Sequence, residues 1–275
     1  MMGRARKAMR MLELLKQEFV QRALIAGVGL AIPLGVLGCF MLWRRMSFFS
    51  DAMGHAAILG VIGGLILHIH PQLAVGGIAL LAALILSRHR HSSRLPLDTW
   101  LGAVSYGGLA LGLCLMALNP SVRVSPEAIL FGEILSVTWT DVVWVLAVAI
   151  FTPLLFWKIW RVVILITMDE DWAATNNIPV YSIQMIFLTT IALVTAVGLK
   201  ITGALLLPAL MVFPAATSSY FARSPEKMVI ISSLIAMVAF VIGALTSFWF
   251  DLPTGPAIVV ISLVFMVIGS IGKKF

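Results

Sequence analysis

Nine long apolar stretches follow one another along this 275-residue chain, and no other feature limits its fold as strongly. A helix needs about 17–25 mostly apolar residues to cross the hydrocarbon core of a bilayer. One stretch begins near Asp51, and the other eight contain no charged residue: 23–43, 71–87, 99–122, 142–157, 172–199, 201–222, 228–250 and 252–272. These stretches fill the chain and leave no soluble domain. We predict a single all-α domain over residues 1–275, a polytopic transmembrane bundle of about nine crossings (eight to ten).

The charge balance gives information about topology rather than about a nucleic-acid partner. Only 11% of the residues are charged, whereas soluble domains have roughly 25%. The net charge of +7 comes from basic residues in short loops between the stretches. Such residues are typical of loops that stay in the cytoplasm. We therefore expect a membrane protein in contact with lipid and no binding of nucleic acid.

Every second loop is basic, which predicts the orientation of the chain. The alternate loops and the C-terminal end carry these basic residues: Arg44, Arg45, Arg88, Arg90, Arg94, Lys158, Arg161, Arg223, Lys227, Lys273 and Lys274. With an odd number of crossings, the C-terminus is expected in the cytoplasm and the N-terminus outside. The first 20 residues conflict with this orientation because they are basic and amphipathic. Two interpretations of them stay open, an extension lying in the membrane interface and the basic region of an uncleaved signal.

Asp51 and His55 lie four residues apart at the start of the second stretch. On a helix this spacing places both side chains on one face, about 5–6 Å apart. A carboxylate and an imidazole are both ligands for zinc, and ionisable groups inside a bilayer usually mark a functional site. The pair therefore predicts a metal pathway. Two simpler roles stay open, Asp51 as the N-cap of the helix and His55 as a hydrogen-bonded core histidine.

One chain supplies only this pair, whereas a zinc site usually has four ligands. A two-fold dimer around a central pore would bring two copies of Asp51 and His55 together. An incomplete site in each protomer also suits transport, because the ion must be released again. We therefore expect a homodimer.

An acidic segment in a loop expected in the cytoplasm is the second polar feature. Thr167 and Glu170 have the spacing of a capping box, and acidic residues are favoured in the first turn of a helix. Asn177 and Pro179 can then end the helix. The pattern predicts a short helix over 168–177, either a solvated connector or a docking helix for a cytoplasmic partner. The candidate contact residues are Asp169, Glu170, Asp171, Trp172 and Ala173.

His68 and His70 end the second crossing on the outer side. Residues two apart on a helix point in different directions, so joint metal binding requires an unwound helix end. We treat the two histidines as a weaker candidate for an outer metal contact.

Pro208 and Pro214 lie inside one apolar stretch. Each proline removes a backbone donor, which predicts a kinked or broken helix. Broken helices in transporters often lie beside the substrate pathway, although prolines are also common in ordinary transmembrane helices.

Motifs for nucleotide hydrolysis and for hydrolytic catalysis are absent from the sequence. It contains no His-Glu-x-x-His, no Gly-x-x-x-x-Gly-Lys and no Gly-x-Ser-x-Gly. We expect no catalytic residues and no enzymatic activity in this chain.

Several segments together resemble the membrane permeases of bacterial zinc/manganese ABC importers, and most closely the zinc-uptake permeases of Gram-negative bacteria. The likeness runs in order from about residue 19 to the C-terminus. It is carried by WRRMSFFSDAMGHAAILGV, LPLDTWLG, ILFGEILSVTWTD, GALLLPALMVFPAATSSYFARSPEKM and FDLPTGPAIVV.

The resemblance implies a homodimeric permease with a type II ABC-importer-like fold in the bacterial inner membrane. Its implied partners are two cytoplasmic ATPase subunits and a periplasmic metal-binding protein. It implies that Asp51 and His55 lie on the metal pathway and that residues 168–177 contact the ATPase. The implied cargo is Zn²⁺, with Mn²⁺ or Fe²⁺ as alternatives and no permanently bound cofactor.

The sequence departs from these relatives in the fourth crossing. The similar zinc permeases have a histidine where this chain has Ser105 or Tyr106, so the resemblance supplies no third ligand there. Two other function classes remain as alternatives. A secondary carrier would exchange protons for metal at Asp51 and His55 without an ATPase, and an intramembrane enzyme would need a nucleophile–base set that the sequence does not contain.

Overall fold

The computed structural model describes residues 17–90, 96–120 and 126–272, and within these ranges the chain forms helices and no β-strand. The elements are α2 (Glu18–Trp43), α3 (Phe49–Ile66), α4 (Pro71–Arg90), α5 (Leu97–Leu118), α6 (Pro126–Phe131), the 3₁₀ helix η1 (Ile134–Ser136), α7 (Trp139–Met168), α8 (Glu170–Thr175), α9 (Val180–Phe221), α10 (Pro225–Phe250) and α11 (Thr254–Gly272). An amphipathic segment was expected over residues 1–20, and residues 1–16 of it lie outside the described residues.

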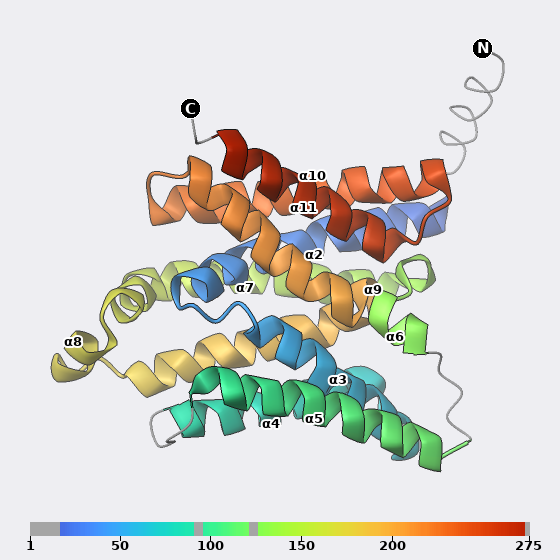
Figure 1. The fold of residues 1–275 in the computed structure, drawn as a ribbon, viewed down its shortest axis with the longest axis horizontal. Helices are drawn as coiled ribbons and strands as arrows, with labels where there is room; N and C mark the ends of the chain where they lie inside the picture. Colours follow the sequence, from blue (N-terminus) through green and yellow to red (C-terminus); the bar gives the residue numbers. More distant parts are fainter. Residues whose placement is uncertain (1–16, 91–95, 121–125, 273–275) are drawn as a thin grey trace.

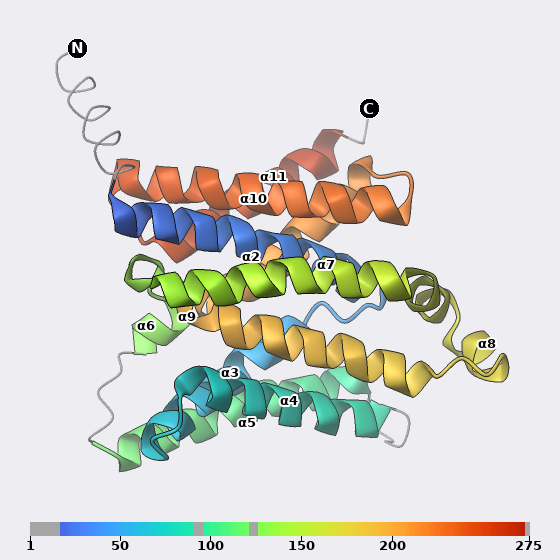
Figure 2. The same cartoon turned by 180° about the vertical axis from the view of Figure 1, so that it is seen from behind.

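Among the described residues, eight helices are long and apolar enough to cross a membrane. One of them, α9, has 42 residues and would be about 63 Å long if it were straight, twice the hydrocarbon thickness. It is broken at Gly203, where φ is 72° and ψ is 170°. The two halves of α9 meet at the break, and the second half runs back along the bundle (Figures 1 and 2). The two halves count as separate crossings, which agrees with the predicted bundle of about nine.

The break in α9 depends on close contact between two backbone segments. Gly132 also has a positive φ, 71°, and a Cβ atom on either glycine would overlap backbone atoms of the other segment. The backbone N–H of Glu133 donates to the carbonyl oxygen of Lys200 at 3.0 Å. The segment that contains α6 and η1 therefore supports the reversal of α9 at one end of the bundle.

The break lies before the two prolines for which the sequence predicted a kink. Helical dihedral angles continue through Pro208 and Pro214, and Gly203 is the position inside α9 with non-helical angles. Transmembrane helices tolerate proline because surrounding groups satisfy the freed carbonyls. A glycine with positive φ, by contrast, cannot continue a right-handed helix. The break therefore lies at Gly203 and not at the prolines, and a kink at Pro208 or Pro214 stays a prediction.

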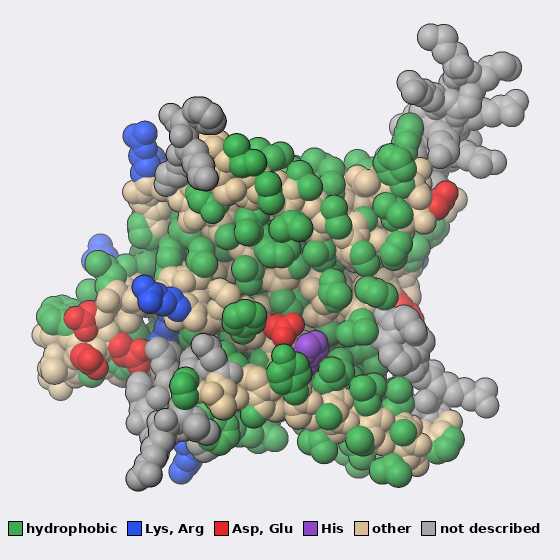
Figure 3. Space-filling model, viewed as in Figure 1, with side chains coloured by type: hydrophobic (Ala, Val, Ile, Leu, Met, Phe, Trp, Pro, Cys, Tyr) green, Lys and Arg blue, Asp and Glu red, His purple; other side chains and the backbone are tan. Residues whose placement is uncertain are grey.

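Successive connections between the long helices lie by turns at the two ends of the bundle. α2 begins at one end and α11 ends at the other, where α8 also projects from the bundle (Figure 1). Most Lys and Arg side chains on the face drawn in Figure 3 gather toward the α8 end, and hydrophobic side chains cover much of the surface between the ends. This distribution is the one expected of a bundle surrounded by lipid with one strongly basic end.

Burial distinguishes central from peripheral helices. In α2 and α9, 78% of the most apolar 18-residue window is buried, compared with 22% in α5. A helix that is apolar on all sides is suited to the centre of a membrane bundle. α2 and α9 thus form the core of the bundle, and the shorter α3 packs against α9 as well as against α4 and α5.

Candidate functional site

α3 places Asp51 and His55, both partly exposed, away from the two ends of the bundle. The connection over residues 44–48 runs inward from the α8 end, so α3 begins between its neighbours rather than at that end (Figures 1 and 2). Met46 within this connection and Phe49, the first residue of α3, are both buried. Asp51 lies in the first turn of α3, although the N-cap residue is Phe48 and makes no side-chain capping bond. The simple N-cap role for Asp51 is therefore wrong.

The two side chains form a close pair, as their spacing predicts. His55 Nδ1 lies 3.8 Å from Asp51 Oδ2 and 2.7 Å from the hydroxyl oxygen of Ser105 on α5. The Asp51 side chain is 46% exposed and that of His55 is 22% exposed. Because these contacts involve Nδ1, Nε2 is the imidazole nitrogen available to a metal ion.

A cavity of about 210 Å³ adjoins Asp51 and Ser105, and its lining does not include His55. Its lining comes from the start of α3 and from α5, and consists of Phe48, Asp51, Leu101, Gly102, Ser105 and Tyr106. Phe48 and Tyr106 are both largely exposed. Figure 3 shows a carboxylate and an imidazole side by side on a mainly hydrophobic face, over the start of α3. Across the described ranges, no group of three or more His, Cys, Asp or Glu side chains is placed to hold a metal ion.

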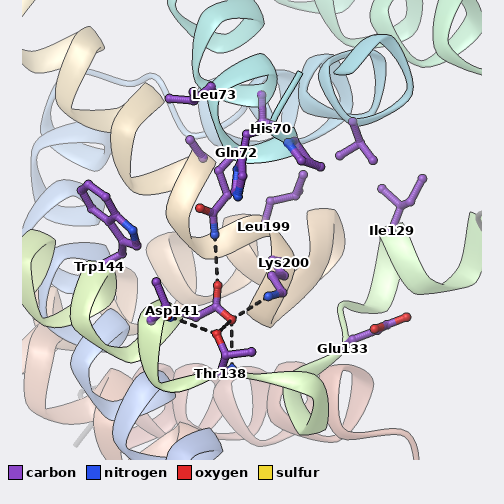
Figure 4. A pocket seen from close by; sticks show the side chains of 15 residues that line it. His70, Gln72, Leu73, Ile129, Glu133, Thr138, Asp141, Trp144, Leu199 and Lys200 are labelled. Carbon is purple, nitrogen blue, oxygen red and sulfur yellow. Dashed lines mark hydrogen bonds and ion pairs between the residues drawn. The ribbon is translucent and has the colours of Figure 1, made fainter. Parts of the chain in front are cut away.

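A larger cavity, about 780 Å³, opens at the end of the bundle opposite α8. It lies between the start of α4, the α6–η1 segment, the start of α7 and the end of the first half of α9, with His70, Glu133, Trp144 and Lys200 among its lining residues (Figure 4). Most of its lining is apolar. We refer to it as the outer cavity.

Asp141 connects three of these elements at the wall of the outer cavity. Its carboxylate accepts hydrogen bonds from Lys200 Nζ at 2.6 Å and from Gln72 Nε2 at 3.1 Å (Figure 4). It also accepts from the backbone N–H and the hydroxyl of Thr138, while Thr138 caps α7. The Asp141 side chain is only 7% exposed, so the partly exposed Lys200 compensates a buried charge.

The two outer histidines differ in position. The chain is non-helical between Leu67 and His70, and His68 has a positive φ of 54°. The helix end is therefore unwound, which the predicted joint binding required. His70 lines the outer cavity, whereas the cavity lining does not include His68.

The acidic segment forms α8, which is shorter than the predicted range of 168–177. Its N-cap is Asp169, whose Oδ1 accepts from the N–H of Trp172 at 2.8 Å. Thr167 instead belongs to α7 and bonds to the carbonyl of Val163. The predicted Thr167–Glu170 capping box is therefore wrong. Asn177 has a positive φ and follows the end of the helix, as expected.

The five candidate contact residues of α8 point in different directions. Ala173 is buried, and Glu170 Oε2 lies 3.5 Å from Nη2 of Arg44. Asp169, Asp171 and Trp172 are exposed at the tip of the bundle. Only part of the predicted set is thus available to an external partner.

Sequence reasoning missed the network around Asp141 and the role of Arg44. The Thr138–Asp141 spacing resembles a capping box and was a usable signal, as was Lys200, the one charged residue between two apolar stretches. The partner of Arg44 lies 126 residues away in sequence, so no local pattern could reveal it.

Comparison with known proteins agrees with this architecture. The sequence profile of the ABC 3 transport family matches residues 16–273. The high-affinity zinc uptake system membrane protein ZnuB of Haemophilus influenzae is 31% identical over 94% of this chain and 98% of its own length. The manganese transport system membrane protein MntC of Halalkalibacterium halodurans is 28% identical over 91% of this chain and 86% of its own length.

A solved structure gives the same result at the level of the fold. PsaBC from Streptococcus pneumoniae, solved in complex with a Fab, aligns with a TM-score of 0.85 and 31% identity over 95% of this chain and 94% of that chain. The match covers the broken α9 as well as the outer helices, because it leaves only 5% of this chain unaligned. The chain therefore belongs to the ABC 3 transport family of membrane permeases.

Proposed function

We propose that this chain is the permease subunit of an ATP-driven importer that carries Zn²⁺ across a bacterial inner membrane. The zinc-uptake relative from Haemophilus influenzae supports the cargo, and the family match supports the transport class. The chain itself would provide the pathway, and ATP hydrolysis would occur in separate subunits.

The observation that carries the proposal is the close Asp51–His55 pair in the first turns of α3. One oxygen and one nitrogen ligand suit zinc. Both side chains are partly exposed, and Asp51 lines a cavity. A site with few ligands binds weakly enough to release its ion, as transport requires. Zn²⁺ passes this site as cargo.

A second copy of the chain would complete the metal coordination. Each protomer would contribute its own Asp51 and His55 across a two-fold axis, giving two nitrogen and two oxygen ligands. The exposed aromatic side chains of Phe48 and Tyr106 beside the pair support an interface there.

The α8 end would face the cytoplasm and contact the ATPase. The basic loops gather at this end, as the positive-inside rule requires. Asp171 and the large apolar surface of Trp172 form the exposed contact. The C-terminal end of α11 lies at the same end and would also be cytoplasmic (Figure 1).

The outer cavity would receive the ion from a periplasmic binding protein. It lies at the end opposite α8, and His70 and Glu133 are potential metal ligands in its wall. The ion would then move between the helices toward Asp51 and His55.

Manganese is the second candidate cargo. Relatives named as manganese permeases match over most of the chain, and the oxygens of Asp51 and Ser105 beside one imidazole are hard ligands that suit Mn²⁺. The nitrogen ligand and the zinc-uptake relatives favour zinc.

Metal uptake into proteoliposomes tests the proposal. The vesicles would contain the permease with or without its ATPase and binding protein, and Zn²⁺ and Mn²⁺ would compete. We expect zinc uptake only with all components and ATP. Uptake by the permease alone, driven by a pH gradient, would show that the chain is a secondary carrier. Preferential uptake of manganese would identify the cargo as Mn²⁺ within the same importer class.

A further inference from the structure

One ion pair joins α8 to the part of the chain that leads to the metal-binding pair. Glu170 is the first residue of α8, and its Oε2 lies 3.5 Å from Nη2 of Arg44, which follows the last residue of α2. The backbone connects α8 directly to α7 and α9 but not to α2 or α3. The side chains of Arg44 and Glu170 thus provide a connection that the chain path lacks.

The surroundings of Arg44 make this connection stiff. Its side chain is only 5% exposed, and its Cζ lies 5.7 Å from the centre of the Phe187 ring on α9. A guanidinium over an aromatic face is attracted to the ring. A buried charge that loses its partner is costly, so Arg44 and Glu170 should move together rather than separate.

Arg44 also begins the short connection to α3. The N–H of Met46 donates to the carbonyl of Met41 at 2.8 Å, and the N–H of Phe49 donates to the carbonyl of Met46 at 2.9 Å. Met46 and Phe49 are both buried. Asp51 follows two residues later. A short connection that is hydrogen-bonded at both ends and anchored by the buried Met46 transmits a displacement of Arg44 to the first turn of α3 instead of absorbing it.

We propose that the Arg44–Glu170 ion pair is the link through which movement of α8 repositions Asp51 and His55. This inference rests on the proposed function, because α8 is moved by the ATPase. When α8 moves, Glu170 draws Arg44 with it, and residues 44–48 shift the start of α3 against Ser105 on α5. Arg44 and Glu170 are positioning residues, since neither contacts the ion.

The test compares the number of zinc ions imported per ATP hydrolysed by the whole complex in proteoliposomes. Glu170→Gln, Arg44→Met and the double variant should each lower this ratio by about tenfold, a typical size for coupling between two sites. The double variant should lose no more than the single ones, because residues that act as one unit are not additive. Arg44→Lys, which keeps the charge, should retain more of the ratio than Arg44→Met.

Arg45→Met is the matched control, because it removes the same charge from the neighbouring, exposed residue. Its ratio should match that of the unchanged complex. A structural defect alone would lower hydrolysis and import together and leave the ratio unchanged, which would overturn the inference. The double variant removes both charges of the ion pair together, so it remains informative if a single variant does not assemble. A normal ratio in the double variant would also overturn the inference. If the unchanged complex imports no zinc with ATP, the proposed function fails instead.

Discussion

His55 Nδ1 lies 2.7 Å from the hydroxyl oxygen of Ser105, so the imidazole on α3 is held by a residue of α5. The same nitrogen is 3.8 Å from Asp51 Oδ2. A hydrogen bond to one ring nitrogen fixes the orientation of the other toward a metal ion. In the proposed site, Ser105 would orient Nε2 toward the ion. Ser105 is one of the two residues, with Tyr106, at which similar zinc permeases are expected to have a histidine.

We expect Ser105→Ala to lower zinc import by about tenfold or more, the usual effect of removing a hydrogen-bond partner of a metal ligand. The reason is that the imidazole loses its fixed orientation. Import by the complete complex in proteoliposomes measures the effect. Ser50→Ala is the control, because Ser50 is also a buried serine of this region and its hydroxyl has no hydrogen-bond partner among the described residues. Equal import by both variants would show that Ser105 has no positioning role.

Asp51→Asn and His55→Ala should each reduce zinc import by more than about tenfold, while the variants still insert into the membrane. Each substitution removes one ligand of the proposed site. Asp251→Asn is a matched control for the first variant, because Asp251 is an exposed residue at a helix end in the left-handed conformation that Asn also adopts. Normal import by both site variants would exclude this pair from the pathway.

Trp172→Ala should weaken the complex with the ATPase by about 2 kcal/mol, since exposed tryptophans often dominate an interface. Asp171→Arg should act in the same direction. The measurement is the amount of ATPase that co-purifies with the permease at a fixed ATPase concentration. Trp157→Ala removes another exposed tryptophan from the surface of α7 and serves as control. If all three variants retain the ATPase equally, the exposed side of α8 is not the contact.

Lys200→Met should lower the free energy of unfolding by about 2 kcal/mol, less than the 3–5 kcal/mol typical of fully buried pairs, because Lys200 is partly exposed. The substitution leaves the buried carboxylate of Asp141 with Gln72 and Thr138 as its remaining partners. Thermal unfolding of the purified permease in detergent reports the loss as a lower Tm. The double variant with Asp141→Asn should recover part of it, and a double variant less stable than Lys200→Met would contradict this account.

Gly203→Ala should destabilise the permease by at least about 1–3 kcal/mol, the range for a non-glycine residue held in an unfavourable backbone conformation. The added Cβ would also overlap the carbonyl oxygen of Leu130. Gly77→Ala is the control, because a Cβ atom there meets no other atom within 4 Å. The Tm in detergent should fall for the first variant and stay the same or rise for the second. Equal Tm values would mean that the α6–η1 segment adapts to the methyl group.

The sequence was sufficient to predict the features that depend on local patterns. Apolar stretches marked the crossings because membrane spans must be long and uninterrupted. The spacing of Asp51 and His55 placed them together because both lie on one helix. The basic loops indicated which connections share an end of the bundle, since each crossing takes the chain to the other side of the membrane.

Features that depend on contacts between distant segments were not predictable in this way. Gly203 breaks α9 because Gly132 approaches it from a segment about 70 residues earlier, whereas Pro208 and Pro214 had the stronger local signal. Ser105 meets His55 across 50 residues of sequence, and Arg44 meets Glu170 across 126. None of these contacts leaves a periodic pattern in the sequence.

The reversal at Gly203 also determines how this part of the chain enters the membrane during synthesis. The ribosome delivers α9 as 42 residues with Lys200 as their one charged residue, and no polar loop separates the two halves. We therefore expect the two halves to enter the membrane together as a helical hairpin. Its tip, Lys200 to Gly203, is then held by the α6–η1 segment, which is made earlier.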